Sequence, residues 1–163
     1  MRILININII CIGRLKEKYW SDAIAEYSKR LKRYCNLSIK ELKEDRLPDN
    51  PSAADEDKVK INEGKSILNA IREGSYVIAL DLRGKALSSE ELADKINKLA
   101  IEGSSNVDFI IGGSIGLSKA VIDRSDMILS FSRMTFPHQM MRLILMEQIY
   151  RSFKIIKNEK YHK

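Results

Sequence analysis

Short apolar runs alternate with segments of helical period along the sequence. The run from Ile5 to Ile12 is followed by residues 16–34, in which aromatic and aliphatic side chains recur on one helical face. Further apolar runs at residues 37–39, 76–80, 107–111 and 127–131 alternate with helical segments at residues 53–72, 89–101, 118–124 and 137–156. Because strands that alternate with helices form parallel sheets, the sequence predicts an α/β fold with a mostly parallel sheet and helices on both faces.

The length of 163 residues corresponds to about one domain. No internal repeat, low-complexity tract or long linker divides the sequence. We therefore expect residues 1–163 to form a single domain. The longest apolar runs, such as Leu143–Met146, are far shorter than the roughly 18 residues that a membrane span requires, so no membrane association is expected.

The start of the chain and its cysteines indicate a cytoplasmic protein. Asn6 and Asn8 interrupt the apolar stretch near Met1, and no small-residue cleavage site follows, so we expect no signal peptide. Cys11 and Cys35 form neither a CxxC pair nor a secreted framework, which fits a reducing compartment. With only two histidines besides these cysteines, a zinc site is not expected.

The net charge of +6 is unevenly distributed. Residues 1–46 hold eleven basic and six acidic residues, residues 47–129 hold ten and fourteen, and residues 130–163 hold seven and two. The two ends are therefore basic and the middle is acidic. This pattern is compatible with an anionic partner such as RNA, but a modest excess alone does not establish one.

Three predicted strands end in segments that could bind a ligand. In open α/β sheets, ligands bind beyond the carboxyl ends of the strands. The segments are residues 80–84, the glycine-rich residues 111–116 and residues 131–136. The glycine spacing, G-G-x-x-G, matches neither the dinucleotide fingerprint nor a P-loop. Two interpretations of these glycines stay open: a tight turn between strand and helix, or a backbone that closely approaches a ligand.

The last predicted helix is apolar over more than one face. It contains Met140, Met141 and Met146 among other large apolar residues. Such a helix is either a flexible filler of the core or part of a dimer interface. Arg142 and Arg151 interrupt it, and they either face solvent or contact phosphates.

Four segments together resemble one bacterial family. They are residues 13–20 (GRLKEKYW), 109–118 (FIIGGSIGLS), 129–142 (LSFSRMTFPHQMMR) and the ending YHK at 161–163. The sequence is similar, over nearly its whole length, to the large-subunit ribosomal RNA pseudouridine N3-methyltransferases (RlmH), a small branch of the SPOUT class. About four residues precede the matching first strand.

The resemblance implies a fold, a cofactor and an assembly. The fold would contain a C-terminal deep trefoil knot of the SPOUT type. The protein would be a homodimer with each active site at the subunit junction, and S-adenosyl-L-methionine would be the cofactor. By match to the family's motifs, the cofactor-binding residues would be Leu80, Gly112, Phe131, Ser132, Arg133, Met134, Thr135 and Phe136.

The resemblance also implies the substrate, a pseudouridine in a 23S rRNA stem-loop at the ribosomal subunit interface, methylated on N3. We expect His162, together with Tyr161, to reach the substrate base as catalytic residues, and Arg142 to orient the base or its phosphate. His138 is expected to be structural, capping or orienting the cofactor loop. A basic track along phosphates by Lys29, Arg30, Lys32 and Arg33 is a further hypothesis.

Three alternative functions are considered. A non-catalytic ribosome- or RNA-binding module would explain the basic ends equally well, and a SPOUT methyltransferase could act on another RNA. A flavodoxin-like signalling domain fits poorly, because Gly13 and Arg14 stand after the first strand where that class has acidic residues.

Overall fold

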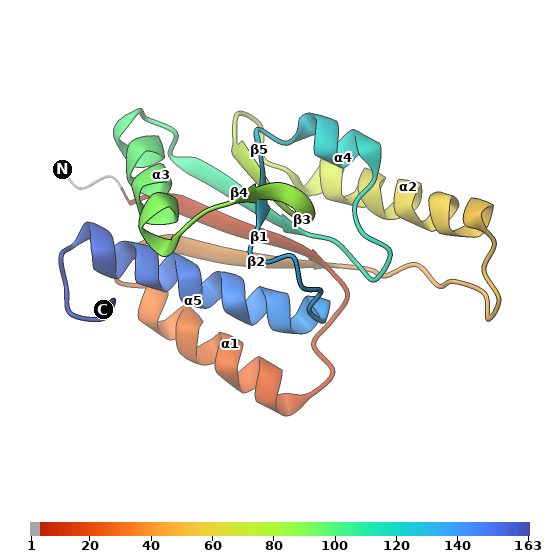
Figure 1. The fold of residues 1–163 in the computed structure, drawn as a ribbon, viewed down its shortest axis with the longest axis horizontal. Coiled ribbons are helices and arrows are strands. Elements are labelled where there is room, and N and C mark those ends of the chain that lie inside the picture. Colours follow the sequence, from red (N-terminus) through yellow and green to blue (C-terminus); the bar gives the residue numbers. More distant parts are fainter. Residues whose placement is uncertain (1–3) are drawn as a thin grey trace.

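A computed structural model describes residues 4–163, in which five parallel strands form one sheet between two layers of helices (Figure 1). The sheet has the order β2-β1-β4-β3-β5. This arrangement confirms the predicted α/β class and the parallel sheet. The strands are β1 (Asn6–Ile12), β2 (Asn36–Leu42), β3 (Tyr76–Ala86), β4 (Asn106–Ile111) and β5 (Met127–Ser130). The helices are α1 (Lys18–Leu31), α2 (Ala53–Ala70), α3 (Ser89–Ile101), α4 (Lys119–Arg124) and α5 (His138–Ile156).

Local sequence signals start several of these helices. Ser88 accepts a hydrogen bond from the backbone N–H of Glu91, whose side chain accepts one from the backbone of Ser88, so the two residues form a capping box at the start of α3. Ser52 and Asp55 form the same box at the start of α2. These bonds satisfy N–H groups that a helix cannot pair internally, which fixes where each helix begins.

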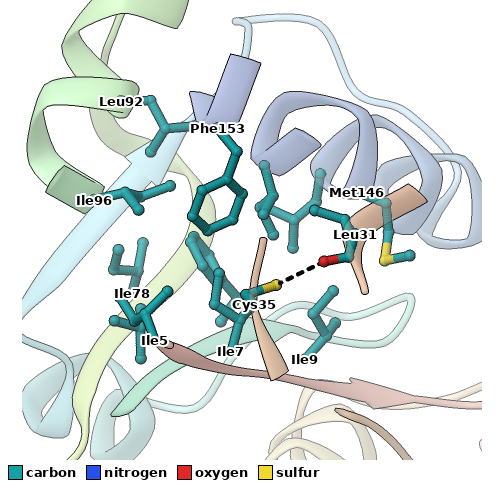
Figure 2. Packing of buried hydrophobic residues seen from close by; sticks show 14 of the residues in the cluster. Ile5, Ile7, Ile9, Leu31, Cys35, Ile78, Leu92, Ile96, Met146 and Phe153 are labelled. Atoms are coloured by element: carbon teal, nitrogen blue, oxygen red, sulfur yellow. Dashed lines mark hydrogen bonds between the residues drawn. The ribbon is translucent and has the colours of Figure 1, made fainter. Parts of the chain in front are cut away.

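Two apolar clusters hold the layers together. On one face of the sheet, α1, α3 and α5 share an apolar cluster with β1, β3 and β4, and Figure 2 shows Phe153 and Leu31 in this cluster together with Ile7 and Ile9 of β1. On the other face, α2 and α4 cover a smaller cluster around Ile10 and Ile110. Neighbouring strand residues thus point into opposite clusters, which explains why β1 and β4 are buried almost throughout.

Strand β3 is longer than the sequence predicts. It pairs with β5 through residues 78–80, shifts register, and pairs again through Lys85 and Ala86. Gly84 makes this possible, because a Cβ atom there would lie 2.7 Å from the backbone of Ile128 and Leu129. Residues 81–84 therefore form an irregular excursion within β3, between its two pairings with β5.

None of the helices in residues 4–163 is long and apolar enough to cross a membrane. Within the same residues, no group of three or more His, Cys, Asp or Glu side chains is arranged to hold a metal ion. The N-terminal residues Met1, Arg2 and Ile3 lie outside the described part of the chain, so of the residues 2–5 that precede the matching first strand, Leu4 and Ile5 are described.

Candidate functional site

A cavity of about 770 Å³ opens beside residues 80–83 of β3 and at the carboxyl ends of β4 and β5. Its walls come from the excursion of β3, from the glycine loop after β4, and from the segment between β5 and α5. These are the three segments that the sequence indicates, although the first lies within β3 and not at its end. Its lining is mainly apolar, and its size lies within the range of about 300–1,000 Å³ that is usual for small-molecule sites.

The structure brings most of the expected cofactor-binding residues together around this cavity. The cavity is lined by Leu80, Gly112, Phe131, Ser132, Met134, Thr135 and Phe136. Arg133 is exposed and is not among the lining residues. His138 also lines the cavity, at the first turn of α5, where it is half-buried.

The glycine loop owes its shape to the packing of the chain itself. Gly116 has a φ of +85°, which favours glycine, and its N–H donates to the carbonyl of Gly113 over 3.1 Å. A Cβ atom on Gly112 would lie 2.9 Å from the side chain of Leu117. A tight turn therefore accounts for these glycines, and the same turn leaves Gly112, Gly113 and Gly116 on the cavity wall.

Serine hydroxyls fix the loop that follows β5. Ser132 Oγ accepts a hydrogen bond from the N–H of Met134 over 3.0 Å, and Ser130 Oγ donates to the carbonyl of Ser132 over 3.0 Å. These bonds hold the backbone in a compact turn without any regular strand or helix. The turn presents Phe131 and Met134 to the cavity.

Asp81 is an acidic residue on the cavity wall. Arg83 donates to it from its backbone N–H, from Nε at 2.8 Å and from Nη2 at 2.9 Å. The side-chain hydrogen bonds from Arg83 hold the pKa of Asp81 below its ordinary value, although partial burial opposes this. A carboxylate therefore stands at the edge of a mainly apolar cavity.

Glu63 of α2 lies directly behind the glycine loop and is not indicated by the sequence. Its side chain is buried, Oε1 accepts from the N–H of Asp45 over 3.2 Å, and Oε2 has no partner within the described residues. A Cβ atom on Gly113 would lie 3.1 Å from Oε2. Burial raises the pKa of this carboxyl. In the sequence, the only indication that α2 packs closely behind this loop is the neighbouring Gly64, which lets α2 approach Ser118.

The C-terminal residues form a polar cluster on the second half of α5. Tyr161 donates to Glu147 Oε1 over 3.1 Å, and Arg151 binds the same carboxylate through Nε and Nη2. His162 lies between Arg151 Nη1, at 3.1 Å from Nδ1, and Glu90 Oε1, at 2.6 Å from Nε2. Because arginine can only donate, Nδ1 is the acceptor, and the proton sits on Nε2 facing Glu90.

This cluster is not at the cavity of the same chain. His138 lines the cavity at the start of α5, whereas Glu147 and Arg151 lie nine and thirteen residues further along. At 1.5 Å per helical residue, these positions are roughly 14 and 20 Å from the first turn. The structure therefore separates Tyr161 and His162 from the expected cofactor-binding residues.

Arg142 is enclosed by protein. It is 1% exposed, and its guanidinium donates to Glu41 Oε2 over 2.7 Å and to the carbonyl of Gly13 over 3.2 Å. In this arrangement the side chain is not open to a ligand. The sequence suggests that Arg142 contacts a substrate base or phosphate. From its buried position in the structure, the side chain does not form such a contact.

Comparison with known proteins defines the class. The family model described as "Predicted SPOUT methyltransferase" matches residues 5–162. A probable methyltransferase from Bordetella pertussis Tohama I has a similar fold, with a TM-score of 0.56 over 91% of this chain and 95% of that chain at 13% identity. A putative methylase family protein from Neisseria gonorrhoeae gives a TM-score of 0.52 over 91% and 83% of the two chains at 15% identity. At these identities the two structures show the fold alone.

Closer relatives define the family. The protein "Ribosomal RNA large subunit methyltransferase H" from Clostridium novyi (strain NT) is 59% identical over 158 residues, which cover 97% of this chain and 99% of that protein. Its namesake from Alkaliphilus oremlandii (strain OhILAs) has the same identity and coverage. The chain therefore belongs to the SPOUT methyltransferase family and, within it, to the ribosomal RNA large subunit methyltransferase H group. The family indicated by the sequence motifs is confirmed.

Proposed function

We propose that this protein is an S-adenosyl-L-methionine-dependent methyltransferase that modifies N3 of a pseudouridine in 23S rRNA. The observation that carries the proposal is the cavity beside β3 and the ends of β4 and β5, because its walls unite nearly all the residues of the family's cofactor motifs. The names of the relatives support an rRNA substrate. The protein would act in the cytoplasm, where ribosomes are found.

The chemistry of the cavity walls fits this cofactor. A mainly apolar lining with Phe131 and Leu80 suits the faces of an adenine ring, and the backbone groups of the turns can satisfy its polar edge. S-adenosyl-L-methionine, when bound, supplies an electrophilic methyl group on a positively charged sulfur. The carboxylate of Asp81 provides a negative charge on the same wall. No metal ion is required by this scheme.

The reaction needs a positioned base as well as a positioned methyl group. The bond from methyl carbon to sulfur breaks, a bond to N3 forms, and the N3 proton leaves to an acceptor. The protein's largest contribution would be to hold N3 in line with the methyl group. Tyr161 is poorly suited as the proton acceptor, because burial raises its hydroxyl pKa and the hydroxyl already donates to Glu147. Because its proton is held by Glu147, the hydroxyl oxygen can instead accept a hydrogen bond from the base.

His162 is the better candidate for contact with the substrate. Its Nε2 meets Glu90, whose side chain is 61% exposed, so a substrate atom can replace this contact. Its Nδ1 is held by Arg151, which fixes the orientation of the ring. An imidazole so oriented presents its Nε2–H as a hydrogen-bond donor to a carbonyl oxygen of the base, and a water molecule would take the N3 proton.

The distance between tail and cavity favours catalysis across a dimer. Since Tyr161 and His162 lie near the far end of α5 from the cavity of their own chain, we propose that they serve the cavity of a second copy. The proposed homodimer would use exposed parts of α5, such as the half-buried Met140 and Ile144. A deep trefoil knot around β5 is part of the same proposal, and the family match and the close crossing of Gly84 over β5 support it.

Two measurements test the activity. Calorimetry should detect binding of S-adenosyl-L-methionine, and mass spectrometry of 23S rRNA from cells lacking the protein should find one methyl group missing from a pseudouridine. Complementation with the intact gene should restore it, and His162→Ala should lower turnover by about 100-fold or more while leaving cofactor affinity unchanged. Absence of cofactor binding would favour the non-catalytic RNA-binding alternative. A methyl group missing from a different RNA would favour the other-substrate alternative.

A mixed dimer tests the arrangement across subunits. One chain would carry Ser132→Trp, which fills the cavity, and the other His162→Ala. Each variant alone should be inactive. If the tail serves the partner's cavity, the mixed dimer regains one complete site and should recover about a quarter to a half of wild-type turnover, depending on how completely mixed dimers form. No recovery in purified mixed dimers would place tail and cavity of the same chain in one site.

A further inference from the structure

Arg142 and Glu41 together fasten the loop that follows β1. Arg142 Nη2 donates to the carbonyl of Gly13 over 3.2 Å, and Glu41 Oε2 accepts both from Arg142 Nη1 and, over 3.3 Å, from the N–H of Leu15. The N–H of Gly13 donates to the carbonyl of Leu42 over 2.8 Å. The ion pair therefore holds the backbone on both sides of Arg14: Arg142 of α5 binds Gly13, and Glu41 of β2 binds Leu15.

The fastened loop lies beside the cavity. A Cβ atom on Gly13 would be 3.7 Å from Nε2 of His138, which lines the cavity. Figure 1 shows the chain after β1 passing the first turn of α5 on its way to α1. The ion pair thus sets the position of a surface loop at the edge of the proposed active site.

Two cations of this loop are free to bind an anion. Arg14 and Lys16 are exposed, and neither forms an ion pair with any group in residues 4–163. Lys18, the next cation along the chain, is different because it pairs with Asp22 over 2.7 Å. The nearby acidic residues are Glu41, which pairs with Arg142, Glu17, which is exposed, and Glu44, whose Oε2 would lie 3.6 Å from a Cβ atom on Gly13.

We infer that Gly13–Lys16 is a phosphate-binding loop for the RNA substrate, and that the buried Arg142–Glu41 pair is the positioning element that presents it. The inference rests on the proposed function, since it supplies a contact for the RNA that the cavity receives. Arg14 and Lys16 bind phosphates flanking the target nucleotide. Arg142 does not touch the RNA; it acts through the backbone of Gly13 and, by way of Glu41, of Leu15.

The salt dependence of ribosome binding tests the loop. The probe is the intact 70S ribosome from cells lacking the protein, and the variants are Arg14→Ala with Lys16→Ala and a control, Lys95→Ala with Lys98→Ala on α3. Each lost phosphate contact reduces the slope of log association constant against log salt concentration by about 0.7–0.9, so the loop variant should lose about 1.5. Its affinity for S-adenosyl-L-methionine should match wild type. A slope equal to that of the α3 control would overturn the inference, even if methylation by wild type is confirmed.

A second variant tests the positioning role. Arg142→Met should lower the salt slope in the otherwise wild-type protein, because the loop is released. In the background of Arg14→Ala with Lys16→Ala it should lower the slope no further, since the cations are already absent. Thermal unfolding and cofactor binding would identify a variant that fails to fold, and Arg142→Lys then replaces it. Equal effects of the Arg142 variant in both backgrounds would contradict a role through the loop.

Discussion

Arg142 and Glu41 form an ion pair with a nitrogen–oxygen distance of 2.7 Å, in which the arginine side chain is 2% exposed and the glutamate 39%. Removing Glu41 therefore has a different consequence for the remaining side chain than removing Arg142. Without Glu41, a guanidinium remains buried beside a single carbonyl, whereas without Arg142 the carboxylate can turn to water.

This asymmetry predicts unequal costs of substitution. Glu41→Ala should lower the free energy of unfolding by about 2–4 kcal/mol, because it strands a buried charge. Arg142→Met, which fills a similar volume with apolar atoms, should cost about 1 kcal/mol or less. Denaturant unfolding measures both, and Asp94→Ala, from the exposed pair with Lys98, serves as the surface control at about 0.5 kcal/mol. The explanation fails if Arg142→Met is the costlier change.

Glu63 should make stability depend on pH in a direction opposite to most carboxylates. Burial raises its pKa in the folded state, so its contribution is complete below the ordinary glutamate pKa and is lost as the pH rises through the raised value. Glu63→Gln removes this loss. Its stability relative to wild type, measured by denaturant unfolding, should therefore increase as the pH rises above the ordinary glutamate pKa.

Asp55 provides the matching control in the same helix. Its hydrogen bond from the backbone of Ser52 lowers its pKa, so its contribution is present above the ordinary aspartate pKa and is lost as the pH falls. Asp55→Asn should lose stability relative to wild type at neutral pH and approach it in acid. Parallel pH trends for the two variants would show that the environments of these carboxyls do not control the effect.

Ser132 should matter for cofactor binding more than for folding. Its hydroxyl holds the N–H of Met134 in the turn that lines the cavity. Ser132→Ala should weaken binding of S-adenosyl-L-methionine by up to about tenfold, since one hydrogen bond that orders the loop contributes about 1 kcal/mol. Calorimetry gives the affinity, and Ser66→Ala on α2, whose hydroxyl contacts only its own helix, should leave it unchanged.

The two cysteines should be unreactive in the folded protein. Burial raises the pKa of Cys11 to about 11 and that of Cys35 to about 12, so almost no thiolate is present at neutral pH. Figure 2 shows Cys35 within the apolar cluster, with its Sγ 3.8 Å from the carbonyl oxygen of Leu31. Mass spectrometry after iodoacetamide treatment should find neither modified until denaturant is added. Rapid labelling of either cysteine under native conditions would indicate local opening around it.

Periodic patterns predict the elements well but their pairing poorly. The run from Val107 to Ile111 is apolar because β4 is buried on both faces, and this local signal is sufficient to identify a strand. The second pairing of β3 with β5 has no such signal, since Lys85 and Ala86 look like turn residues. It depends on the close crossing at Gly84, which is a contact between segments more than forty residues apart.

The sequence by itself determined the α/β class, the family and the three segments that line the cavity, because periodic patterns and motifs can be recognised from neighbouring residues alone. Only the tertiary structure decided which polar groups meet. It placed Arg142 against Glu41, 101 residues away, and inside the protein rather than on a ligand. It also placed His162 beside Glu90 at the far end of α5 from the cavity. The partner of a charged side chain depends on packing across layers, and this information is not present in the spacing of residues along the chain.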